Sequence, residues 1–310
     1  MNKLIISKFY NNKLLGFHLV DDEAEMIYDF SDSEVGNIYC GYIKDVAKNL
    51  SSVFVEFGEG KKGFLADKDQ EYKTGDKVLV EVVADNIKTK DYLLTTKLSL
   101  KGDELETVKA KFEHATPKSI LKKNDYMIDT CRMLVESGTE IITDDKMVSQ
   151  NLEGAKIQNL LYNSNSGISI ENTYRLGKII KDVLSKKVWM DSGAYLVIEH
   201  TEALTTIDVN SGKNVSKKDR DENLKCINFE AAEYIMKHLR LRNISGIIIV
   251  DFINMREEYY DELFDFMNDL SKTDNVVCNV VGFTKLGLLE ITRKKNRKSL
   301  KEILGEVRND

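Results

Sequence analysis

Proline, paired cysteines and long apolar runs are nearly absent from this 310-residue sequence, which holds one proline and four cysteines. No apolar run approaches the ~20 residues that a transmembrane helix needs, and the N-terminus does not resemble a signal peptide. The cysteines form no C-x-x-C pair, which indicates reduced thiols and no structural zinc. We therefore expect a cytoplasmic protein without a membrane span or a bound zinc ion.

An excess of positive charge is also missing, because 45 basic residues face 51 acidic ones and the net charge is −6. This balance argues against a protein that binds nucleic acid through its overall charge. It leaves open a protein with local basic patches whose acidic residues hold a metal. No phosphate-binding loop, nucleophile elbow or dinucleotide motif occurs, and the four histidines show no spacing suited to a metal or a catalytic triad.

Short strand patterns fill the first hundred residues. Residues 1–33 contain three such runs, and residues 37–100 contain five runs separated by glycine and aspartate turn signals. Five short strands in this length suit a small closed barrel, either a nucleic-acid-binding OB-fold or another type. Residues 103–190 are predicted to be mostly helical, and the charged, aperiodic segment Gly102 to Lys123 is the best candidate for a linker.

From residue 193 onward, strand and helix patterns alternate. Helices are predicted at about Asp221 to Arg242 and Glu257 to Leu270, between apolar strands such as GIIIVDFINM. This alternation predicts a layered α/β domain.

Two strand ends in this region carry acidic residues. Asp208 and Asn210 are two positions apart and so share one face of a strand, and Asp251 follows four aliphatic residues. A helix joins the two strands, so the carboxylates can meet at one edge of a sheet and bind a hard cation such as Mg²⁺. The alternative is that Asp208 caps a turn while Asp251 pairs with Arg240 or Arg242.

Two other features suit nucleic-acid binding. Phe54 and Phe64 in the barrel region can stack bases if they are exposed, or fill the barrel core if they are not. The run LGLLEITRKKNRKSLKE gathers basic residues in an otherwise acidic chain, either as a phosphate-contacting patch or as a solvated helix face.

Taken in order, these segments resemble the catalytic region of the bacterial ribonuclease E/G family. The resemblance rests on HTEALTTIDVNSG, on NFEAAEYIMKHLRLRNISGIIIVDFINM and on LGLLEITRKKNRKSL, together with the barrel region from VGNIYCGYIKDV to LTTKLSLKG. It implies an α+β multidomain fold, in which an OB-fold barrel is inserted in an RNase H-like domain and is followed by a DNase I-like catalytic domain. The implied boundaries are residues 1–35 and 103–190 for the RNase H-like parts, 36–102 for the OB-fold and 191–310 for the catalytic domain.

The resemblance also implies roles for individual residues. Asp208 and Asp251 would hold one Mg²⁺, and Asn210 would orient the scissile phosphate or the attacking water. The positions that would contact single-stranded RNA are Phe54, Phe64, Lys90, Arg293 and Lys295. The implied reaction is hydrolysis of RNA to 5′-phosphate and 3′-hydroxyl ends, in RNA processing or decay.

Three family features are missing from the sequence. We find no I-V-R-T-A-like element that would bind a 5′-monophosphate, and no C-P-x-C motif for a zinc link between subunits. The second acid of the family's D-F-I-D-M is Asn254 here. We therefore expect no zinc-linked dimer, while a homodimer without the zinc link stays open.

Three functions compete on these grounds. A metal-dependent endoribonuclease is favoured by the retained acids, and a non-catalytic RNA-binding protein by the missing elements. A phosphodiesterase acting on a small nucleotide is disfavoured, because a small substrate needs no stacking barrel.

Overall fold

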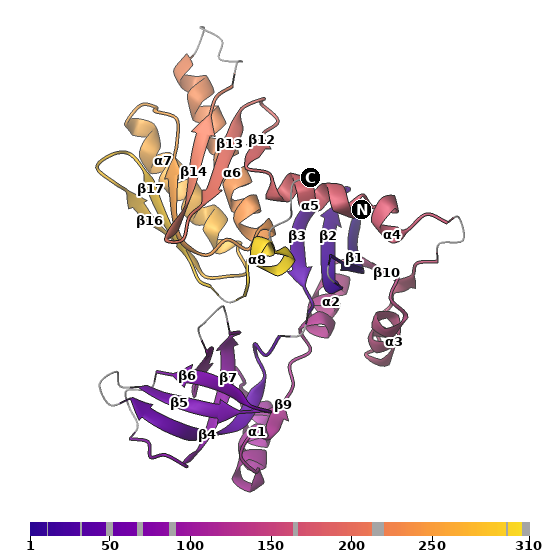
Figure 1. The fold of residues 1–310 in the computed structure, drawn as a ribbon. Helices are drawn as coiled ribbons and strands as arrows, with labels where there is room; N and C mark the ends of the chain where they lie inside the picture. The colour runs from indigo at the N-terminus through magenta and orange to yellow at the C-terminus, as the bar shows by residue number, and fades with distance from the viewer. Residues whose placement is uncertain are drawn as a thin grey trace. The chain divides into compact units, whose positions relative to one another are not determined.

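The chain forms two compact units, Met1–Ser31 with Thr130–Asp310, and Asp32–Asp129 (Figure 1). The second unit is thus inserted in the sequence of the first. The computed structural model describes residues 1–10, 12–31, 33–47, 52–66, 71–86, 91–163, 167–212, 220–295 and 297–305. None of the helices within these ranges is long and apolar enough to cross a membrane.

The inserted unit is built around a closed barrel of five strands. They are β4 (Ile38–Ala47), β5 (Ser52–Phe57), β6 (Lys61–Leu65), β7 (Lys77–Ala84) and β8 (Tyr92–Thr95). The order β5-β6-β8-β7-β4 closes because β4 also pairs with β5, and only the β6–β8 pair is parallel. The predicted small barrel is therefore confirmed, and it is OB-like in strand number and closure.

The barrel interior is filled by alternate residues of each strand, as the two-residue period of a strand requires. Val53, Val55 and Phe57 of β5 belong to this core, whereas Phe54 does not. The wall is tight at Gly63, where an added Cβ would lie 2.5 Å from a methyl carbon of Leu94.

The prediction that Gly102 to Lys123 forms a linker is wrong. This segment forms α1 (Gly102–His114) and β9 (Ile120–Lys122), and β9 pairs with β4. The only buried residue of α1 is Val108, so the helix has almost no apolar face for a sequence pattern to reveal.

The first unit contains two sheets. One has the order β11-β10-β1-β2-β3, in which β1 pairs antiparallel with β2 and parallel with β10. Its strands are β1 (Asn2–Phe9), β2 (Lys13–Val20), β3 (Glu23–Asp29), β10 (Glu140–Thr143) and β11 (Leu160–Leu161). The accompanying helices are α2 (Tyr126–Glu136), which spans the boundary between the units, α3 (Lys146–Gly154), α4 (Ile170–Thr173) and α5 (Leu176–Leu184). Leu176 and Ile180 of α5 share a buried core with Phe17.

The second sheet has the order β12-β13-β14-β15-β17-β16. Its strands are β12 (Lys187–Trp189), β13 (Tyr195–His200), β14 (Leu204–Asn210), β15 (Gly246–Asp251), β16 (Cys278–Phe283) and β17 (Leu289–Arg293). Helix α6 (Arg220–Leu241) connects β14 to β15, and α7 (Glu258–Lys272) connects β15 to β16. These elements confirm the predicted layered α/β region.

Helices α6 and α7 cover only one face of this second sheet. Ile207, Val250 and Ile291 on that face pack against Ile235 and Leu263 of the helices. The opposite face, which we call the open face, carries exposed side chains such as Trp189 and Ile247, at 60% and 51% exposure. The candidate site lies on the open face.

A buried ion pair ties the end of β17 to the loop before β16. The Arg293 guanidinium contacts the Asp274 carboxylate at 2.8 and 2.9 Å and donates to Asn243 Oδ1 and the Ile244 carbonyl. Both ionic side chains are fully buried. The basic C-terminal run therefore begins as a central strand, and a short helix, α8 (Leu300–Leu304), follows it.

We predict that Arg293→Ala lowers the free energy of unfolding by about 3–5 kcal/mol, because it leaves the Asp274 carboxylate buried without a partner. Urea denaturation followed by circular dichroism measures the change. Lys272→Ala is the control, because the Lys272–Asp269 pair is exposed and screened by solvent, so its loss should change stability little. Equal losses in the two variants would contradict the structural role of the buried pair.

A candidate catalytic site at the ends of two parallel strands

The two predicted acids lie side by side. β14 and β15 run parallel, and their register pairs Asp208 directly with Asp251. Neighbouring strands lie about 4.8 Å apart, so the two carboxylates leave the open face next to each other. The sequence prediction that a helical crossover brings these strand ends together is confirmed.

Asn210 completes this cluster. Its side-chain amide donates a hydrogen bond of 2.8 Å to Asp208 Oδ2, so the two residues project on the same side of β14 as predicted. Asp208 and Asp251 are both exposed. The site is therefore open to a large substrate.

The loop that follows Asp251 is fixed from behind by α6. The fully buried Asn228 donates to the Ile253 carbonyl at 2.7 Å and accepts from the Ile253 amide at 3.0 Å. This two-point contact replaces the strand pairing that ends at Asp251. It holds the end of β15 in place without any contribution from the open face.

The alternative roles proposed for the acids are not observed. Neither Asp208 nor Asp251 forms an ion pair within the described part of the chain. Arg242 instead contacts His238 Nδ1 at 3.2 Å and the Ser185 carbonyl at 2.7 Å, on the helix side of the sheet. The two carboxylates thus face solvent without a neutralising arginine.

Two adjacent carboxylates with an amide beside them match the donors that Mg²⁺ takes in proteins, with water completing the coordination. Among the described residues, no cluster of three or more histidine, cysteine or acidic side chains could hold a metal. A cation here would therefore rely on Asp208, Asp251, water and phosphate oxygens, which is the usual arrangement for Mg²⁺ at phosphate-transfer sites.

Sequence patterns missed four further polar or aromatic residues on the open face, namely Lys187, Trp189, Tyr195 and Glu290. The strand register aligns Lys187, Val197, Asp208 and Asp251 in one row across four strands, and Trp189, Tyr195 and Asn210 in the next row. Glu290 also faces this side, opposite Ile249. The short β12 carries Lys187 and Trp189, and the alternation in KVWMDSGAYLVIEH was the only signal that could have revealed them.

The predicted aromatic pair of the inserted unit lies on the outer wall of the barrel. Phe54 and Phe64 are directly opposed on β5 and β6, with ring centroids 5.9 Å apart in an edge-to-face arrangement. Both rings are partly exposed, and Leu93, 40% exposed, is next to Phe64 on β8. The alternative of a core position therefore does not hold for either residue.

Charges near this aromatic pair are largely satisfied. Hydrogen bonds from Lys118 and Lys44 lower the pKa of the Glu56 carboxyl to about 2. Lys61 is paired with Glu34, while the exposed Lys62 has no ion-pair partner within the described ranges. Lys90, the predicted basic contact, lies outside the described residues.

The two predicted basic contacts near the C-terminus differ in position. Arg293 is buried and committed to Asp274, so the buried ion pair replaces the predicted phosphate contact. Lys295 is exposed and lies 3.2 Å from Glu302, which belongs to the capping box of α8. Asn254, which stands where the family has a second acid, is exposed in the loop after Asp251.

Comparisons of the sequence with a family model and with known proteins all point to one family. The sequence model of the ribonuclease E/G family matches residues 73–296. Ribonuclease G of Haemophilus influenzae is 28% identical over 366 aligned positions, which cover 87% of this chain and 74% of the relative. Ribonuclease G of Escherichia coli K12 is 44% identical over 40% of this chain and 26% of its own length. Ribonuclease E of Synechocystis is 24% identical over 92% of this chain and 56% of the relative.

The first of these alignments is longer than the 310 residues of the chain, so the Haemophilus protein carries segments that are missing here. The family match nevertheless spans most of the chain and includes both Asp208 and Asp251. The chain belongs to the ribonuclease E/G family.

Proposed function

We propose that this protein is a metal-dependent endoribonuclease that hydrolyses single-stranded RNA. The observation that carries the proposal is the direct pairing of Asp208 with Asp251 on an open sheet face. Two carboxylates that have no cationic partner among the described residues repel each other and repel RNA, so their side-by-side placement suits a bound divalent ion. The similarity to proteins named ribonuclease G and ribonuclease E supports RNA as the substrate.

The proposed reaction is attack by water on the scissile phosphorus. The water oxygen bonds to phosphorus, the bond to the 3′-oxygen breaks, and that oxygen takes a proton, which leaves a 5′-phosphate and a 3′-hydroxyl. Asp208 and Asp251 would hold one Mg²⁺, which supplies Lewis-acid activation of the phosphate and of a bound water. Asn210, fixed by its hydrogen bond to Asp208, orients the phosphate or the water.

The barrel provides the proposed binding surface for the rest of the strand. Aromatic side chains on a barrel wall stack bases of single-stranded nucleic acid without strong sequence preference. Phe54 and Phe64 have the required exposure, and Lys62, which has no ion-pair partner among the described residues, adds a positive charge on the same wall. Lys90 and Lys295 stay predicted contacts, whereas Arg293 is left out because its guanidinium is buried.

We further propose that the sheet containing β1 is the RNase H-like part and the sheet containing β14 the DNase I-like part. The supporting observation is that residues 32–129 interrupt the first unit, as an inserted barrel should. The inserted unit includes α1 and β9 and so extends beyond the predicted boundary at residue 102.

We predict that Asp208→Asn and Asp251→Asn each reduce RNA cleavage by about 10²–10³-fold, because each removes a charge needed for transition-state stabilisation. RNA binding should be kept or strengthened, since a negative charge beside the phosphate is lost. Cleavage of a short end-labelled AU-rich RNA, with and without Mg²⁺, measures the first effect, and a binding titration measures the second.

The matched control is Glu199→Gln. Glu199 is an exposed acid on the same open face, but it is paired with Lys186 and lies outside the proposed metal site. The Glu199→Gln variant should cleave RNA at the same rate as the wild type. RNA binding without cleavage, alike in the wild type and in both aspartate variants, would instead support a non-catalytic RNA-binding protein.

Phe54→Ala should weaken RNA binding by about 1–3 kcal/mol, the contribution of one stacked base, with little change in thermal stability. Phe57→Ala is the comparison, because the fully buried Phe57 fills the barrel core and its loss should cost about 3–5 kcal/mol of folding stability. Melting curves and RNA titrations on both variants separate the roles. A large loss of stability for Phe54→Ala would count against the stacking surface.

A further inference from the structure

An exposed tryptophan lies in the row next to the acid pair. Trp189 on β12 is paired with Tyr195 on β13, and Tyr195 is paired with Asn210 on β14. The Trp189 and Tyr195 ring centroids are 5.1 Å apart, with the planes inclined by 57°. Trp189 is 60% exposed, so most of its indole faces solvent and not the protein core.

A lysine connects these rings with the acid row. Lys187 belongs to the row of Asp208 and Asp251, and its Nζ lies 3.9 Å from the Trp189 ring centroid and 3.5 Å from that of Tyr195. No carboxylate pairs with this ammonium group within the described ranges. A positive charge is therefore held over two aromatic rings, on a residue whose strand position lies in the row of the acids.

The distance between Trp189 and the acid site suits the spacing between a bound phosphate and the base of a neighbouring nucleotide. Trp189 and Asn210 are two strands apart, which corresponds to about 10 Å along the row. A strand of RNA whose phosphate lies at Asp208 and Asp251 would pass directly over β13 and β12 if it crosses the sheet in this direction. The adjoining base would then meet the exposed indole.

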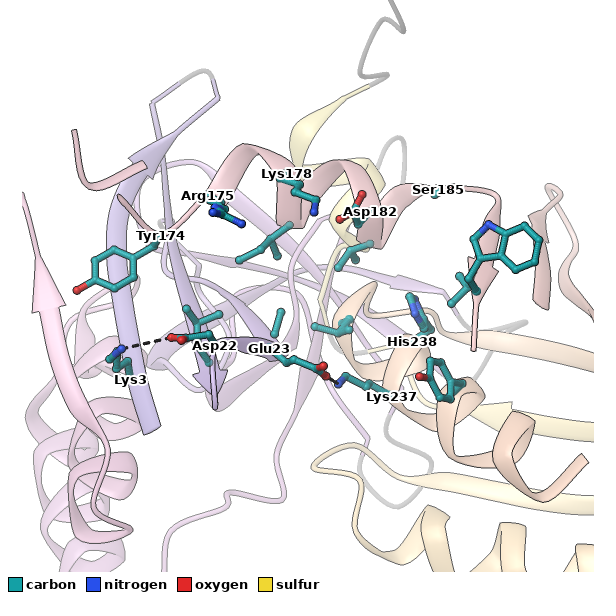
Figure 2. A pocket seen from close by; sticks show the side chains of 18 of the residues that line it. Lys3, Asp22, Glu23, Tyr174, Arg175, Lys178, Asp182, Ser185, Lys237 and His238 are labelled. Carbon is teal, nitrogen blue, oxygen red and sulfur yellow. Dashed lines mark hydrogen bonds and ion pairs between the residues drawn. The ribbon is translucent and has the colours of Figure 1, made fainter. Parts of the chain in front are cut away.

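A large cavity continues from this edge of the sheet. Its volume is about 1140 Å³, and both Lys187 and Trp189 line it. Figure 2 shows the cavity from close by. It lies within the first unit and is bordered by the sheet containing β1, by α5 and by α6. The charged side chains that line it are Lys3, Asp22, Glu23, Arg175, Lys178, Asp182, Lys187 and Lys237.

Most of the negative charge in this cavity is already paired. Lys3 contacts Asp22 at 3.3 Å and Lys237 contacts Glu23 at 3.2 Å, as the dashed lines of Figure 2 show. Arg175, Lys178 and Asp182 lie across the cavity from these pairs, as Figure 2 shows, and none of the three forms an ion pair with a described residue. Burial lowers the pKa of His238 to about 3, so this imidazole is neutral and adds no charge.

We propose that Trp189 and Tyr195 form a stacking site for a base adjoining the cleaved phosphate, and that Lys187, Arg175 and Lys178 receive the RNA backbone beyond it. This inference rests on the proposed function. The occupant is single-stranded RNA because the rings adjoin the acid row, and because the charged groups beyond them that form no ion pair with a described residue, Arg175, Lys178 and Asp182, are positive on balance. Aromatic rings flanked by cations are the combination that binds single strands.

Trp189 is the only tryptophan in the chain, so its fluorescence reports on this site alone. The titration uses the Asp208→Asn/Asp251→Asn double variant, which keeps the RNA intact, and a short single-stranded AU-rich RNA. We expect saturable quenching. In a series of RNAs with one abasic position each, quenching should be lost for a single position next to the cleavage site.

Substitutions test the same site through kinetics. Trp189→Leu should raise KM for cleavage about 5- to 150-fold with kcat largely kept, which corresponds to about 1–3 kcal/mol for one stacked base. Trp189→Phe should retain most of the affinity, because it keeps an aromatic face. Val277→Ala is the control, since Val277 is 62% exposed and adjoins β16, at the other edge of the same sheet.

The outcomes separate this inference from the nuclease proposal. Quenching at one abasic-sensitive position in a wild-type protein that does not cleave RNA would support the stacking site and reject the nuclease. Normal cleavage with unchanged fluorescence, or an unchanged KM in Trp189→Leu, would overturn the stacking site and leave the nuclease intact. Absence of both cleavage and quenching would overturn both.

Discussion

The parallel register between β14 and β15 is the constraint on which the candidate site depends. It is set on the helix side of the sheet, where Ile207 and Val250 pack against α6 and α7. A slip of one residue would turn this apolar set towards solvent, so the core enforces the register strongly. The position of Asp208 opposite Asp251 is therefore a by-product of hydrophobic packing on the far face. Two exposed carboxylates that repel each other can be held together in this way at little local cost.

The two faces of the sheet differ, since only one is covered by helices, and this explains why so many large side chains are exposed on the other. Helices cover one side of the sheet and bury its apolar side chains, so the open face can carry exposed polar and aromatic residues. Trp189, Tyr195 and Lys187 lie there beside the acids. The barrel follows the same rule on a smaller scale, because Phe57 points inward and Phe54 outward from one strand.

Local sequence patterns predict a strand or helix correctly where the element has regularly spaced apolar residues. The five barrel strands, the helix near Asp221 and the strand ending at Asp251 were all predicted, and the shared face of Asp208 and Asn210 followed from the two-residue period. Helix α1 was missed because only Val108 is buried on it. Arg293 was misassigned because charge suggests exposure, whereas its partner Asp274 lies nineteen residues earlier and meets it only after folding. β12 has only three residues, so the short alternation there is a weak signal, and the aromatic row becomes clear only from the strand register.

The inserted barrel also has a consequence for the order in which the chain can fold. All five barrel strands lie within residues 38–95, so the barrel can close as soon as that stretch is available. Strand β1, by contrast, pairs Lys3 with Glu140 and Ile6 with Thr143 of β10. During synthesis the first hairpin therefore lacks its parallel neighbour until more than a hundred further residues have been made. The sheet that contains β1 is therefore completed late, although β1 is synthesised before β10. Until β10 is made, the unpaired apolar edge of β1 must be kept from pairing with other chains.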